Sequence, residues 1–402
     1  MKLTLNTPVE IHEFDRLEAR ELFAIMAKSA GAAGEQAKSF RVAAVCDKTP
    51  IGGRDRVLES LGRLCGVTVF DRVEPNPRTV DIMAMLGQED FGGFSAVLGI
   101  GGGSVLDSAK ALAMLAANGG CLDDYLGASP SKTIAKPSLP LTLIPTTAGT
   151  GSEVTKVGVY TSKEGRKHTL GSPLMMARSA VLCGSLLDGI PPALCASTGF
   201  DALDHALESI WNKNADDATR QMAEDAAVEA LAWLPLAYKN AALIKAGGSG
   251  VPENHNMVCM RMLRASCMAG TAFSITGTAA GHALSFVLSE DWHIAHGTAC
   301  AFTLLDIFDL AAAEEKTAKS LGRIMKRFDP AQDARPVQAL RNHIAAMMDD
   351  MRIPRTFKDL GIVLGPQEIA PHFDRAFSDP KMWNQIPRAT KENIYPLLEK
   401  KC

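Results

Sequence analysis

Apolar and polar positions follow two different rhythms along this chain, and the change falls near residue 190. Before it, short apolar runs rich in β-branched residues alternate with stretches of helical periodicity. The expected strands are 42–46, 67–70, 95–100, 139–144, 154–161 and 179–182. Strands that alternate with helices are typical of a mostly parallel sheet covered on both faces. The segments 155–161 and 167–170 are expected to form a hairpin outside that sheet.

After Pro191 and Pro192 the strand pattern disappears, and apolar residues recur at helical spacing. The expected helices are 193–211, 216–245, 254–273, 278–290, 297–313, 314–327, 335–352, 366–377 and 390–400. A chain of 402 residues exceeds what one hydrophobic core usually supports. The pattern therefore predicts an α/β domain over residues 1–190 and an all-α domain over residues 191–402.

Four polar side chains in the helical half have the character of metal ligands. Asp201 and His205 stand four residues apart, so a helix places both side chains on one face. His282 begins a second apolar helical stretch and His296 opens another, and a helix bundle can bring all four together. Three imidazoles and one carboxylate suit Fe²⁺ or Zn²⁺. The alternative for each histidine is a buried structural role.

A second motif lies upstream, where an apolar strand runs into three glycines and then into a helix, over residues 94–110. Glycines let backbone N–H groups approach an anion, and the helix N-terminus adds a favourable dipole, so a pyrophosphate fits here. Ser104 and Asp107 are spaced as a capping box for this helix. The spacing Gly99-x-Gly101-x-x-Ser104 lacks the glycine or alanine that usually ends a dinucleotide fingerprint, and a simple tight turn is the alternative.

Asp47 is the residue expected to choose the cofactor, because it follows the strand 41–46 directly. A carboxylate at that place accepts hydrogen bonds from the hydroxyls of the adenosine ribose and repels a 2′-phosphate. NAD(H) is therefore favoured over NADP(H). Lys48 next to it weakens that discrimination, and the alternative is that Asp47 merely starts the turn 47–50.

Together with several shorter motifs in the same order, these two motifs resemble one family, the iron-containing (type III) alcohol dehydrogenases. The nucleotide half of that family is similar to that of dehydroquinate synthase and glycerol dehydrogenase. The matching segments are Pro75-Asn76-Pro77, 101–110, 145–155, 188–194, the helix with Asp201 and His205, His282, and His296-Gly297. They extend over nearly the whole chain.

The resemblance implies that Asp201, His205, His282 and His296 bind the metal. It also implies a set of cofactor contacts around the pyrophosphate and the nicotinamide ribose. These contacts are Asn76, Gly102, Gly103, Ser104, Thr146, Thr147 and Lys167. From the residues alone, the two threonines are equally suited to cap a turn, and Lys167 to a solvated hairpin.

The chain departs from the family pattern at a place that concerns proton transfer, and the residues that choose the substrate are not fixed by a motif. Many members carry a further histidine one helical turn after the third metal ligand, where this chain has Phe286, and His293 is a conceivable substitute. An anionic substrate requires a cation in the pocket. Arg178, Arg264 and Arg388 are candidates for it by their position in the chain.

The resemblance implies an NAD(H)- and metal-dependent oxidoreductase that interconverts a small primary alcohol and its aldehyde. Acid-bearing aldehydes, of the lactaldehyde, hydroxy-acid, sulfonate or phosphonate type, are among the substrates that it allows. Two alternatives remain, a metal- and NAD-dependent lyase like dehydroquinate synthase and a catalytically inactive relative. Family members usually dimerise or form larger rings, so a homodimer or a larger homo-oligomer is expected.

Composition excludes other classes of function. The net charge is −3 with both signs interspersed, and only 6% of residues are aromatic, so nucleic acid is not an expected partner. No apolar stretch is long enough for a membrane span or a signal core, which predicts a soluble, cytoplasmic protein. Nine cysteines form no Cys-x-x-Cys pair and are expected to be reduced. Cys195 and Cys300 flank the metal motifs but are not assigned as ligands, because the oxygen and nitrogen donors already suffice.

Overall fold

The computed structural model describes residues 3, 5, 7–34, 38–247, 251–332 and 334–402. The chain divides into two compact units. The first comprises Met1–Thr147, Gly151–Gly189 and Glu253–Leu263, and the second comprises Ala148–Thr150, Ile190–Pro252 and Arg264–Cys402. The division differs from a single boundary near residue 190 in one main respect, because the first turns of helix α8 (His255–Thr276) group with the first unit.

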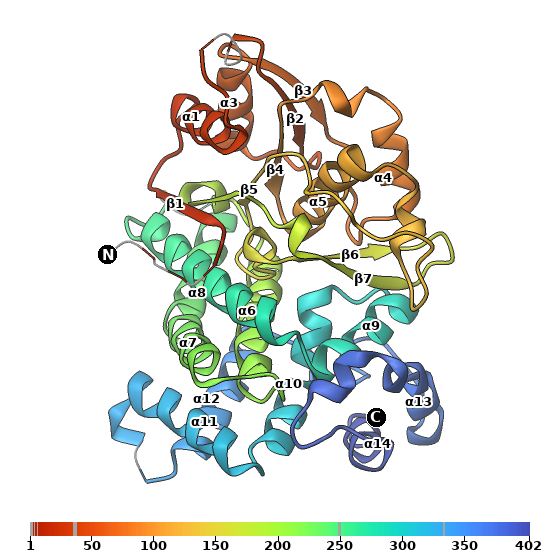
Figure 1. Ribbon diagram of the computed structural model, residues 1–402. Coiled ribbons are helices and arrows are strands. Elements are labelled where there is room, and N and C mark those ends of the chain that lie inside the picture. The colour runs from red at the N-terminus through yellow and green to blue at the C-terminus, as the bar shows by residue number, and fades with distance from the viewer. Residues whose placement is uncertain (1–2, 4, 6, 35–37, 248–250, 333) are drawn as a thin grey trace. The chain divides into compact units, whose positions relative to one another are not determined.

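A six-stranded sheet forms the centre of the first unit, with all strands parallel and in the order β1-β8-β5-β4-β2-β3 (Figure 1). Its strands are β1 Glu10–Phe14, β2 Arg41–Val45, β3 Gly66–Phe70, β4 Ala96–Gly101, β5 Leu141–Pro145 and β8 Ser179–Cys183. The parallel α/β domain expected from the sequence is confirmed. Strand β1 was not among the expected strands, because its Glu10, His12 and Glu13 hide an edge strand from an apolar pattern.

Helices cover both faces of this sheet (Figure 1). One face packs on α1 (Ala19–Ala30) and α3 (Gly52–Leu61), and the other on α4 (Thr79–Leu86) and α5 (Gly103–Asn118). Side chains of β4 alternate accordingly, since Leu98 and Ile100 enter the core under α1. Gly99 points the other way, where an added Cβ would lie 2.8 Å from the Cβ of Ala109. Only glycine at this position lets α5 lie so close to the strand that precedes it.

Strands β6 (Val157–Thr161) and β7 (Lys167–Gly171) pair in an antiparallel hairpin, as the sequence predicts. Two side chains of α5 hold it. Asp107 Oδ2 accepts a hydrogen bond from Val159 N at 2.9 Å, and the buried Lys110 Nζ donates to Val157 O at 2.6 Å. The expected capping box is therefore wrong. Helix α5 begins at Gly103 with Gly102 as its N-cap, and the Asp107 side chain serves the hairpin instead.

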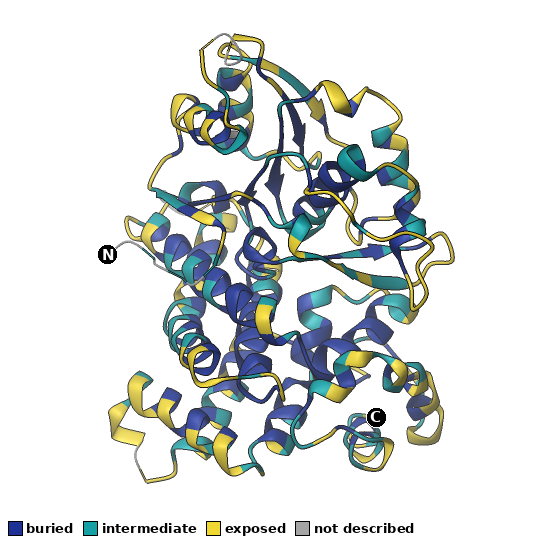
Figure 2. Ribbon diagram, in the orientation of Figure 1, coloured by how far each residue is buried: buried dark blue, intermediate teal, exposed yellow. Residues whose placement is uncertain are grey.

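The second unit is helical, which confirms the all-α prediction. Besides the later turns of α8, it contains α6 Pro192–Ile210, α7 Asp217–Lys245, α9 Ala280–Trp292, α10 His296–Ala311, α11 Glu315–Phe328, α12 Pro336–Asp350, α13 Pro366–His372 and α14 Lys391–Glu399. Helix α6 is buried along most of its length (Figure 2). In the part of the chain that the structure describes, no helix is both long enough and apolar enough to cross a membrane.

Helices α6 and α10 meet almost backbone to backbone. A Cβ added at Gly297 would lie 2.0 Å from the carbonyl oxygen of Ser197, so any other residue would push the two helices apart. This contact lies next to His296, the first residue of α10. The close approach brings the start of α10 to the polar residues of α6.

Candidate functional site

Helix α6 carries four ionisable side chains in its buried middle, Asp201, Asp204, His205 and Glu208, each at most 4% exposed. Their spacing of three and four residues places them on neighbouring turns of the helix. Burying charged groups costs several kcal/mol unless each finds a partner or an ion. The partners come from the helices that follow, α9 and α10.

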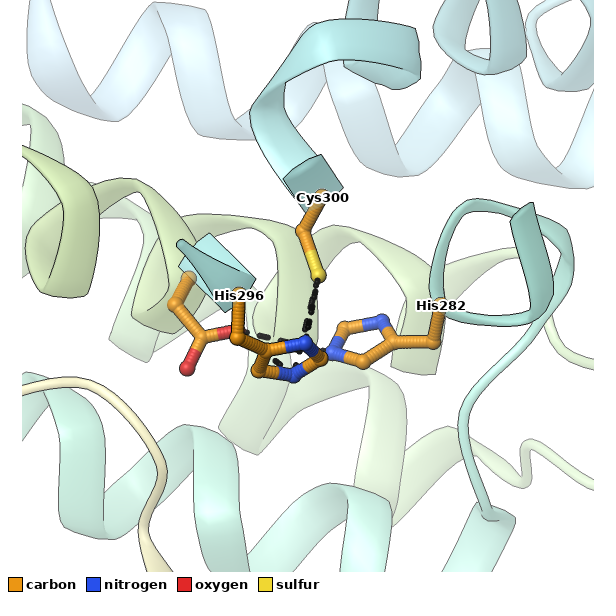
Figure 3. A group of neighbouring side chains, drawn as sticks. His282, His296 and Cys300 are labelled. Atoms are coloured by element: carbon orange, nitrogen blue, oxygen red, sulfur yellow. Dashed lines mark hydrogen bonds and ion pairs between the residues drawn. The ribbon is translucent and has the colours of Figure 1, made fainter. Parts of the chain in front are cut away.

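Three imidazoles converge on one carboxylate oxygen. Asp201 Oδ1 lies 3.8 Å from His205 Nδ1, 3.5 Å from His282 Nε2 and 3.7 Å from His296 Nε2. His282 and His296 come from α9 and α10 and lie side by side (Figure 3). The four side chains singled out in the sequence are thus together in the folded chain. Only His296 is appreciably exposed, at 30% of its side chain.

The atoms at the centre of this cluster fit a divalent metal. Among the residues that the structure describes, Asp201 Oδ1, His205 Nδ1 and His282 Nε2 are buried without a hydrogen-bond partner. Each such atom costs about 1–3 kcal/mol if it stays unsatisfied. Nitrogen and oxygen donors around a tetrahedral Zn²⁺ are separated by about 3.4 Å, given bond lengths near 2.1 Å. The separations from Asp201 Oδ1, 3.5–3.8 Å, are close to that value. Asp201, His282 and His296 also belong to one set of donor atoms that lie within 4.8 Å of one another, whereas His205 is not part of that set.

The electrostatics of the cluster favour a cation. Burial raises the pKa of Asp201, but His205 and His296 outweigh it and hold that pKa far below its usual range. Burial lowers the pKa of His205 to about 4. It would lower the pKa of His282 too, yet the charges of Cys300 and Glu208 raise that pKa well above its usual value. An ionised carboxylate at a place where positive charge is favoured is the environment of a metal site, and a bound ion would take the place of the proton on His282.

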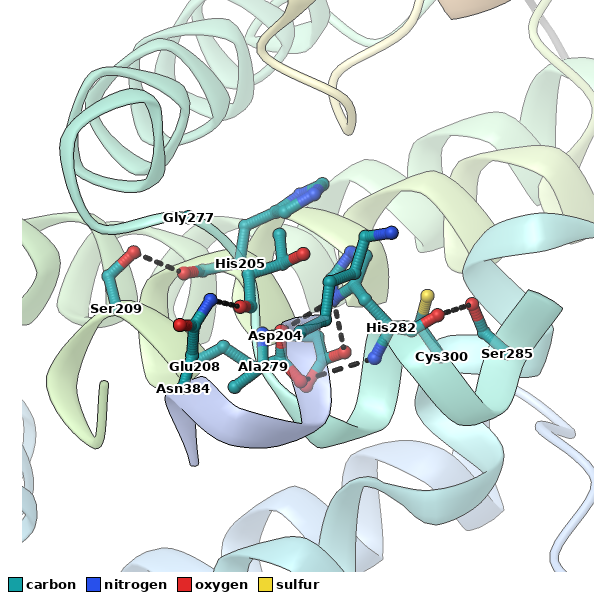
Figure 4. Close-up of polar contacts among 12 residues, drawn as sticks. Asp204, His205, Glu208, Ser209, Gly277, Ala279, His282, Ser285, Cys300 and Asn384 are labelled. Atoms are coloured by element: carbon teal, nitrogen blue, oxygen red, sulfur yellow. Dashed lines mark hydrogen bonds and ion pairs between the residues drawn. The ribbon is translucent and has the colours of Figure 1, made fainter. Parts of the chain in front are cut away.

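Two further acids lie behind His282 (Figure 4). Its Nδ1 is 2.8 Å from Glu208 Oε2 and 3.4 Å from Asp204 Oδ2. Glu208 also accepts hydrogen bonds from Ala279 N at 2.5 Å and from His282 N at 3.2 Å. Burial and the neighbouring Glu208 raise the pKa of Asp204 well above its usual range. Glu208 therefore holds both the backbone and the ring of His282.

Aromatic rings enclose the cluster. Phe273 stacks on His205 with ring centres 4.2 Å apart and planes 14° apart. Phe286, the residue where many relatives carry a histidine, has its ring centre 6.2 Å from that of His296. On that same phenylalanine, Lys381 Nζ lies 4.2 Å from the ring centre. His293 is exposed and ends α9 in a left-handed conformation, φ 54°, which gives it a backbone role.

The residues expected to bind the cofactor belong to the first unit, at the carboxyl ends of parallel strands, where α/β sheets bind ligands. Gly102 and Gly103 open α5 directly after β4. Thr146 follows β5, and its N–H donates to Gly101 O at 3.0 Å. A Cβ on Gly102 would lie 3.5 Å from Thr147 Oγ1, so these two loops are neighbours.

Asn76 and Lys167 reach the same region through the hairpin. Asn76 is exposed, with a left-handed φ of 57°, and its N–H donates to Ser104 Oγ at 3.2 Å. Its carbonyl accepts a hydrogen bond from Thr161 Oγ1 at 3.3 Å, and Thr161 pairs with Lys167 across the hairpin. The Ser104 hydroxyl is thus partly engaged by Asn76.

Asp47 lies two residues beyond β2, and its carboxylate has a protein partner. Its Oδ1 accepts a hydrogen bond from Thr49 N at 2.8 Å and from the buried Arg54 at 3.3 Å. Asp47 therefore starts the turn 47–50, which the sequence offered as the alternative role, because its Oδ1 accepts the hydrogen bond from Thr49 N. The other carboxylate oxygen can face a ligand. Arg54 is a cation that strand patterns do not reveal.

Sequence reasoning missed the residues that support these sites. Glu208 and Asp204 lie seven and three residues after Asp201, so the helical period itself was a sufficient signal. Lys110 carries no such signal, because its partners Ser152, Thr155 and Val157 are distant in sequence, and neither does the contact of Lys381 with Phe286. Arg54 contacts Asp47, Thr49 and Asp55, which are near in sequence but follow no helical or strand repeat. Arg178, one of the three arginines proposed for an anionic substrate, donates instead to the carbonyl of Ser29 in the first unit.

Comparison with known proteins gives matches along most of the chain. The model of a family described as iron-containing alcohol dehydrogenase matches residues 24–183. A second model, described as the C-terminal part of the Fe-containing alcohol dehydrogenase family, matches residues 195–402. The two models meet near the change of pattern at residue 190.

Individual relatives agree with these models. The chain is 32% identical to alcohol dehydrogenase 4 of Saccharomyces cerevisiae over 352 residues, 87% of each chain. It is 32% identical to the sulfoacetaldehyde reductase of Bilophila wadsworthia over 319 residues, 76% of each. The crystal structure of sulfoacetaldehyde reductase from Bifidobacterium kashiwanohense in complex with NAD⁺ superposes with a TM-score of 0.83 at 26% identity, over 100% of this chain and 99% of that one.

Glu153, in the loop after β5, gives a pH test of the first unit. Its two carboxylate oxygens are buried with no hydrogen-bond partner among the described residues, and burial raises its pKa from 4.5 to about 7. Between those values the folded chain holds a proton that the unfolded chain has released, so stability falls as pH rises. Glu153→Gln removes this loss. Relative to the unaltered chain, its free energy of unfolding in urea should gain on the order of 3 kcal/mol from pH 4.5 to 7.

The exposed Glu59 is the control, because it pairs only with Arg63 on the surface of α3. Glu59→Gln should follow the unaltered chain at every pH. If the stability curve of Glu153→Gln runs parallel to that of the unaltered chain, the carboxyl is ionised in the folded state and the prediction is wrong.

Proposed function

The chain belongs to the iron-containing alcohol dehydrogenase family, oxidoreductases that act on CH–OH groups, and from this premise we propose a specific activity for it. It interconverts a small primary alcohol and its aldehyde, with NAD(H) as the hydride carrier and a divalent metal, Fe²⁺ or Zn²⁺, in the helical unit. The observation that carries this proposal is the convergence of Asp201, His205, His282 and His296 on one point with buried, unpaired ligand atoms.

In this proposal the four converging side chains are the metal ligands. When bound, the metal polarises the carbonyl oxygen as a Lewis acid, and NAD(H) exchanges the hydride with the carbonyl carbon. Asp201 contributes the one negative charge of the set. Glu208 accepts the Nδ1 proton of His282, which leaves the Nε2 lone pair directed at the centre of the cluster.

The first unit supplies the cofactor site of the proposal. The backbone N–H groups of Gly102 and Gly103 and the start of α5 favour the pyrophosphate. Thr146, Thr147, Asn76 and Lys167 belong to the loops around them. The Asp47 carboxylate favours ribose hydroxyls and hence NAD(H), while Arg54 beside it reduces the penalty that a 2′-phosphate meets.

Lys381 supports a substrate that carries an acid group. Its ammonium and the ring of His296 both lie near the ring of Phe286, and its side chain is only 16% exposed. Asp379 pairs with it at 3.1 Å, and an anionic substrate group would add a second partner. The similarity to two sulfoacetaldehyde reductases points to the same class of aldehyde.

NADH oxidation is the direct test of the proposed activity. Anaerobically purified protein is reconstituted with Fe²⁺ or with Zn²⁺ and offered short aldehydes, with and without a carboxylate or sulfonate. We expect metal-dependent loss of NADH absorbance, and we expect His282→Ala to abolish it by removing a ligand. His293→Ala is the matched control, because His293 is exposed and lies at the C-terminus of the same helix.

Other outcomes of this assay would favour the alternatives. A lyase like dehydroquinate synthase binds metal and NAD⁺ but gives no net change in nicotinamide absorbance. An inactive relative binds them and turns over nothing. Failure to bind any divalent metal would contradict the proposal at its base.

Glu208→Gln tests the support of His282 apart from turnover. The amide keeps the shape of the carboxyl but cannot accept all three hydrogen bonds that Glu208 receives. Loss of such an outer partner lowers metal affinity by about 10–100-fold. Chelator competition measures that affinity directly. Asp225→Asn, an exposed carboxylate of α7, should leave it unchanged, and an unchanged affinity in Glu208→Gln would show that Glu208 does not position His282.

Lys381→Met tests the substrate class. Loss of a charge-assisted hydrogen bond lowers kcat/KM for an acid-bearing aldehyde by about 10–100-fold, and kcat/KM for a neutral aldehyde of equal length should stay the same. Lys391→Met is the matched control, since Lys391 also lies over an aromatic ring, Phe377, and pairs with an aspartate, Asp374. Equal effects on both aldehydes would assign Lys381 a structural role only.

A further inference from the structure

Cys300 points its sulfur into the cluster of ligand atoms. It lies one helical turn after His296 on α10 and is fully buried. Its Sγ is 3.8 Å from His296 Nε2 and 3.9 Å from His296 Nδ1, and Figure 3 shows it directed at that ring. Sequence spacing assigns no ligand role to this cysteine, whereas the fold places its sulfur beside the ligand set.

The four residues Asp201, His282, His296 and Cys300 form one ligand set of the cluster, to which His205 does not belong. One donor atom from each lies within 4.8 Å of the donor atoms of the other three. Around a tetrahedral ion with a Zn–S bond of 2.3 Å, sulfur and nitrogen are separated by about 3.6 Å. The measured 3.8 Å from Cys300 Sγ to His296 Nε2 is close to this value, but the 3.9 Å to Nδ1 places the sulfur nearly equidistant from both ring nitrogens, so a shared ion requires the His296 ring to turn its Nε2 toward it.

A second observation points to a ligand at the same place. Asp201 Oδ1 and His282 Nε2 belong to this set, are buried, and have no hydrogen-bond partner among the residues that the structure describes. Hydrogen bonding within the protein therefore does not account for the burial of Asp201 Oδ1 and His282 Nε2, whereas a bound ion would. Burial raises the pKa of the Cys300 thiol to about 12.

We propose that Cys300 is a further ligand of the metal ion and that its soft sulfur favours Zn²⁺ over Fe²⁺ in this protein. The inference rests on the metal centre proposed above and deepens it. Thiolates select Zn²⁺ among the common divalent metals, whereas imidazole and carboxylate discriminate less. On binding, the thiol transfers its proton to solvent and the sulfur donates an electron pair to the ion, with no change in the oxidation state of either.

Cobalt substitution tests the sulfur ligand without any measurement of turnover. Co²⁺ bound to thiolate gives an intense charge-transfer band in the near ultraviolet, while Co²⁺ bound to nitrogen and oxygen gives only its weaker visible bands. The full chain, stripped of metal and loaded with Co²⁺, should show both. Cys300→Ser should keep the visible bands and lose the near-ultraviolet band. Cys195→Ser, a second buried cysteine of the same unit, should keep both.

Zinc affinity gives an independent measurement. Chelator competition should show that Cys300→Ser binds Zn²⁺ at least about tenfold more weakly, since loss of an outer-shell partner alone has that effect, and that its Fe²⁺ affinity falls less. Cys300→Ala should behave in the same way, which separates loss of the ligand from effects of the new hydroxyl. Cys195→Ser should not change the affinity for either metal.

The outcomes separate the two proposals. Visible cobalt bands without the near-ultraviolet band in the unaltered chain, or a near-ultraviolet band that survives in Cys300→Ser, would overturn the sulfur ligand and leave the metal centre in place. An unchanged Zn²⁺ affinity in both Cys300 variants would overturn the sulfur ligand too. Absence of all cobalt bands from the unaltered chain, with its helical circular dichroism intact, would overturn the metal centre itself.

Discussion

The helical unit depends on one unfavourable arrangement, a carboxylate and three imidazoles gathered in the interior of a bundle. Asp201, His205 and His282 are almost fully buried, and each has a ligand atom without a hydrogen-bond partner among the described residues. Such atoms lower stability unless something binds between them. The close backbone contact between Gly297 and Ser197 keeps them together, because it holds the start of α10 against α6. The packing therefore maintains a cluster of buried polar atoms that a bound cation would stabilise.

In the α/β unit, by contrast, the polar side chains of α5 have hydrogen-bond partners within the protein. Lys110 of α5 is buried and Asp107 is partly buried, and both hold the β6–β7 hairpin and the loop after β5. The polar side chains that support the proposed cofactor site are thus satisfied by the protein itself. The residues proposed to contact the cofactor, such as Gly102 and Asn76, stay accessible at the carboxyl edge of the sheet. A dinucleotide site requires loops that are held in place by such hydrogen bonds and whose backbone N–H groups stay accessible to the ligand.

The two layers around His282 bear on the choice of metal. On one side Glu208 and Asp204 hold its Nδ1, and on the other Cys300 lies near its neighbour His296. Outer partners set the orientation of a ligand, while the softness of the inner donors sets the preference among metals. Membership of the family does not specify which residues support His282 or which further donor atoms lie near the metal ligands of this chain. Both are properties of this chain's own side chains.

Periodicity along the chain was sufficient to predict the class of each half, because a helix or a strand leaves its repeat in the sequence whatever its neighbours are. Local spacing also singled out Asp201 with His205, which one helix brings together. It missed β1, whose charged residues break the apolar pattern, and it wrongly made Asp107 a helix cap. Only the tertiary structure brought Cys300 to His282, Lys381 to Phe286 and Arg54 to Asp47. These contacts depend on how separate elements pack, and no repeat along the chain records the distance between two of them.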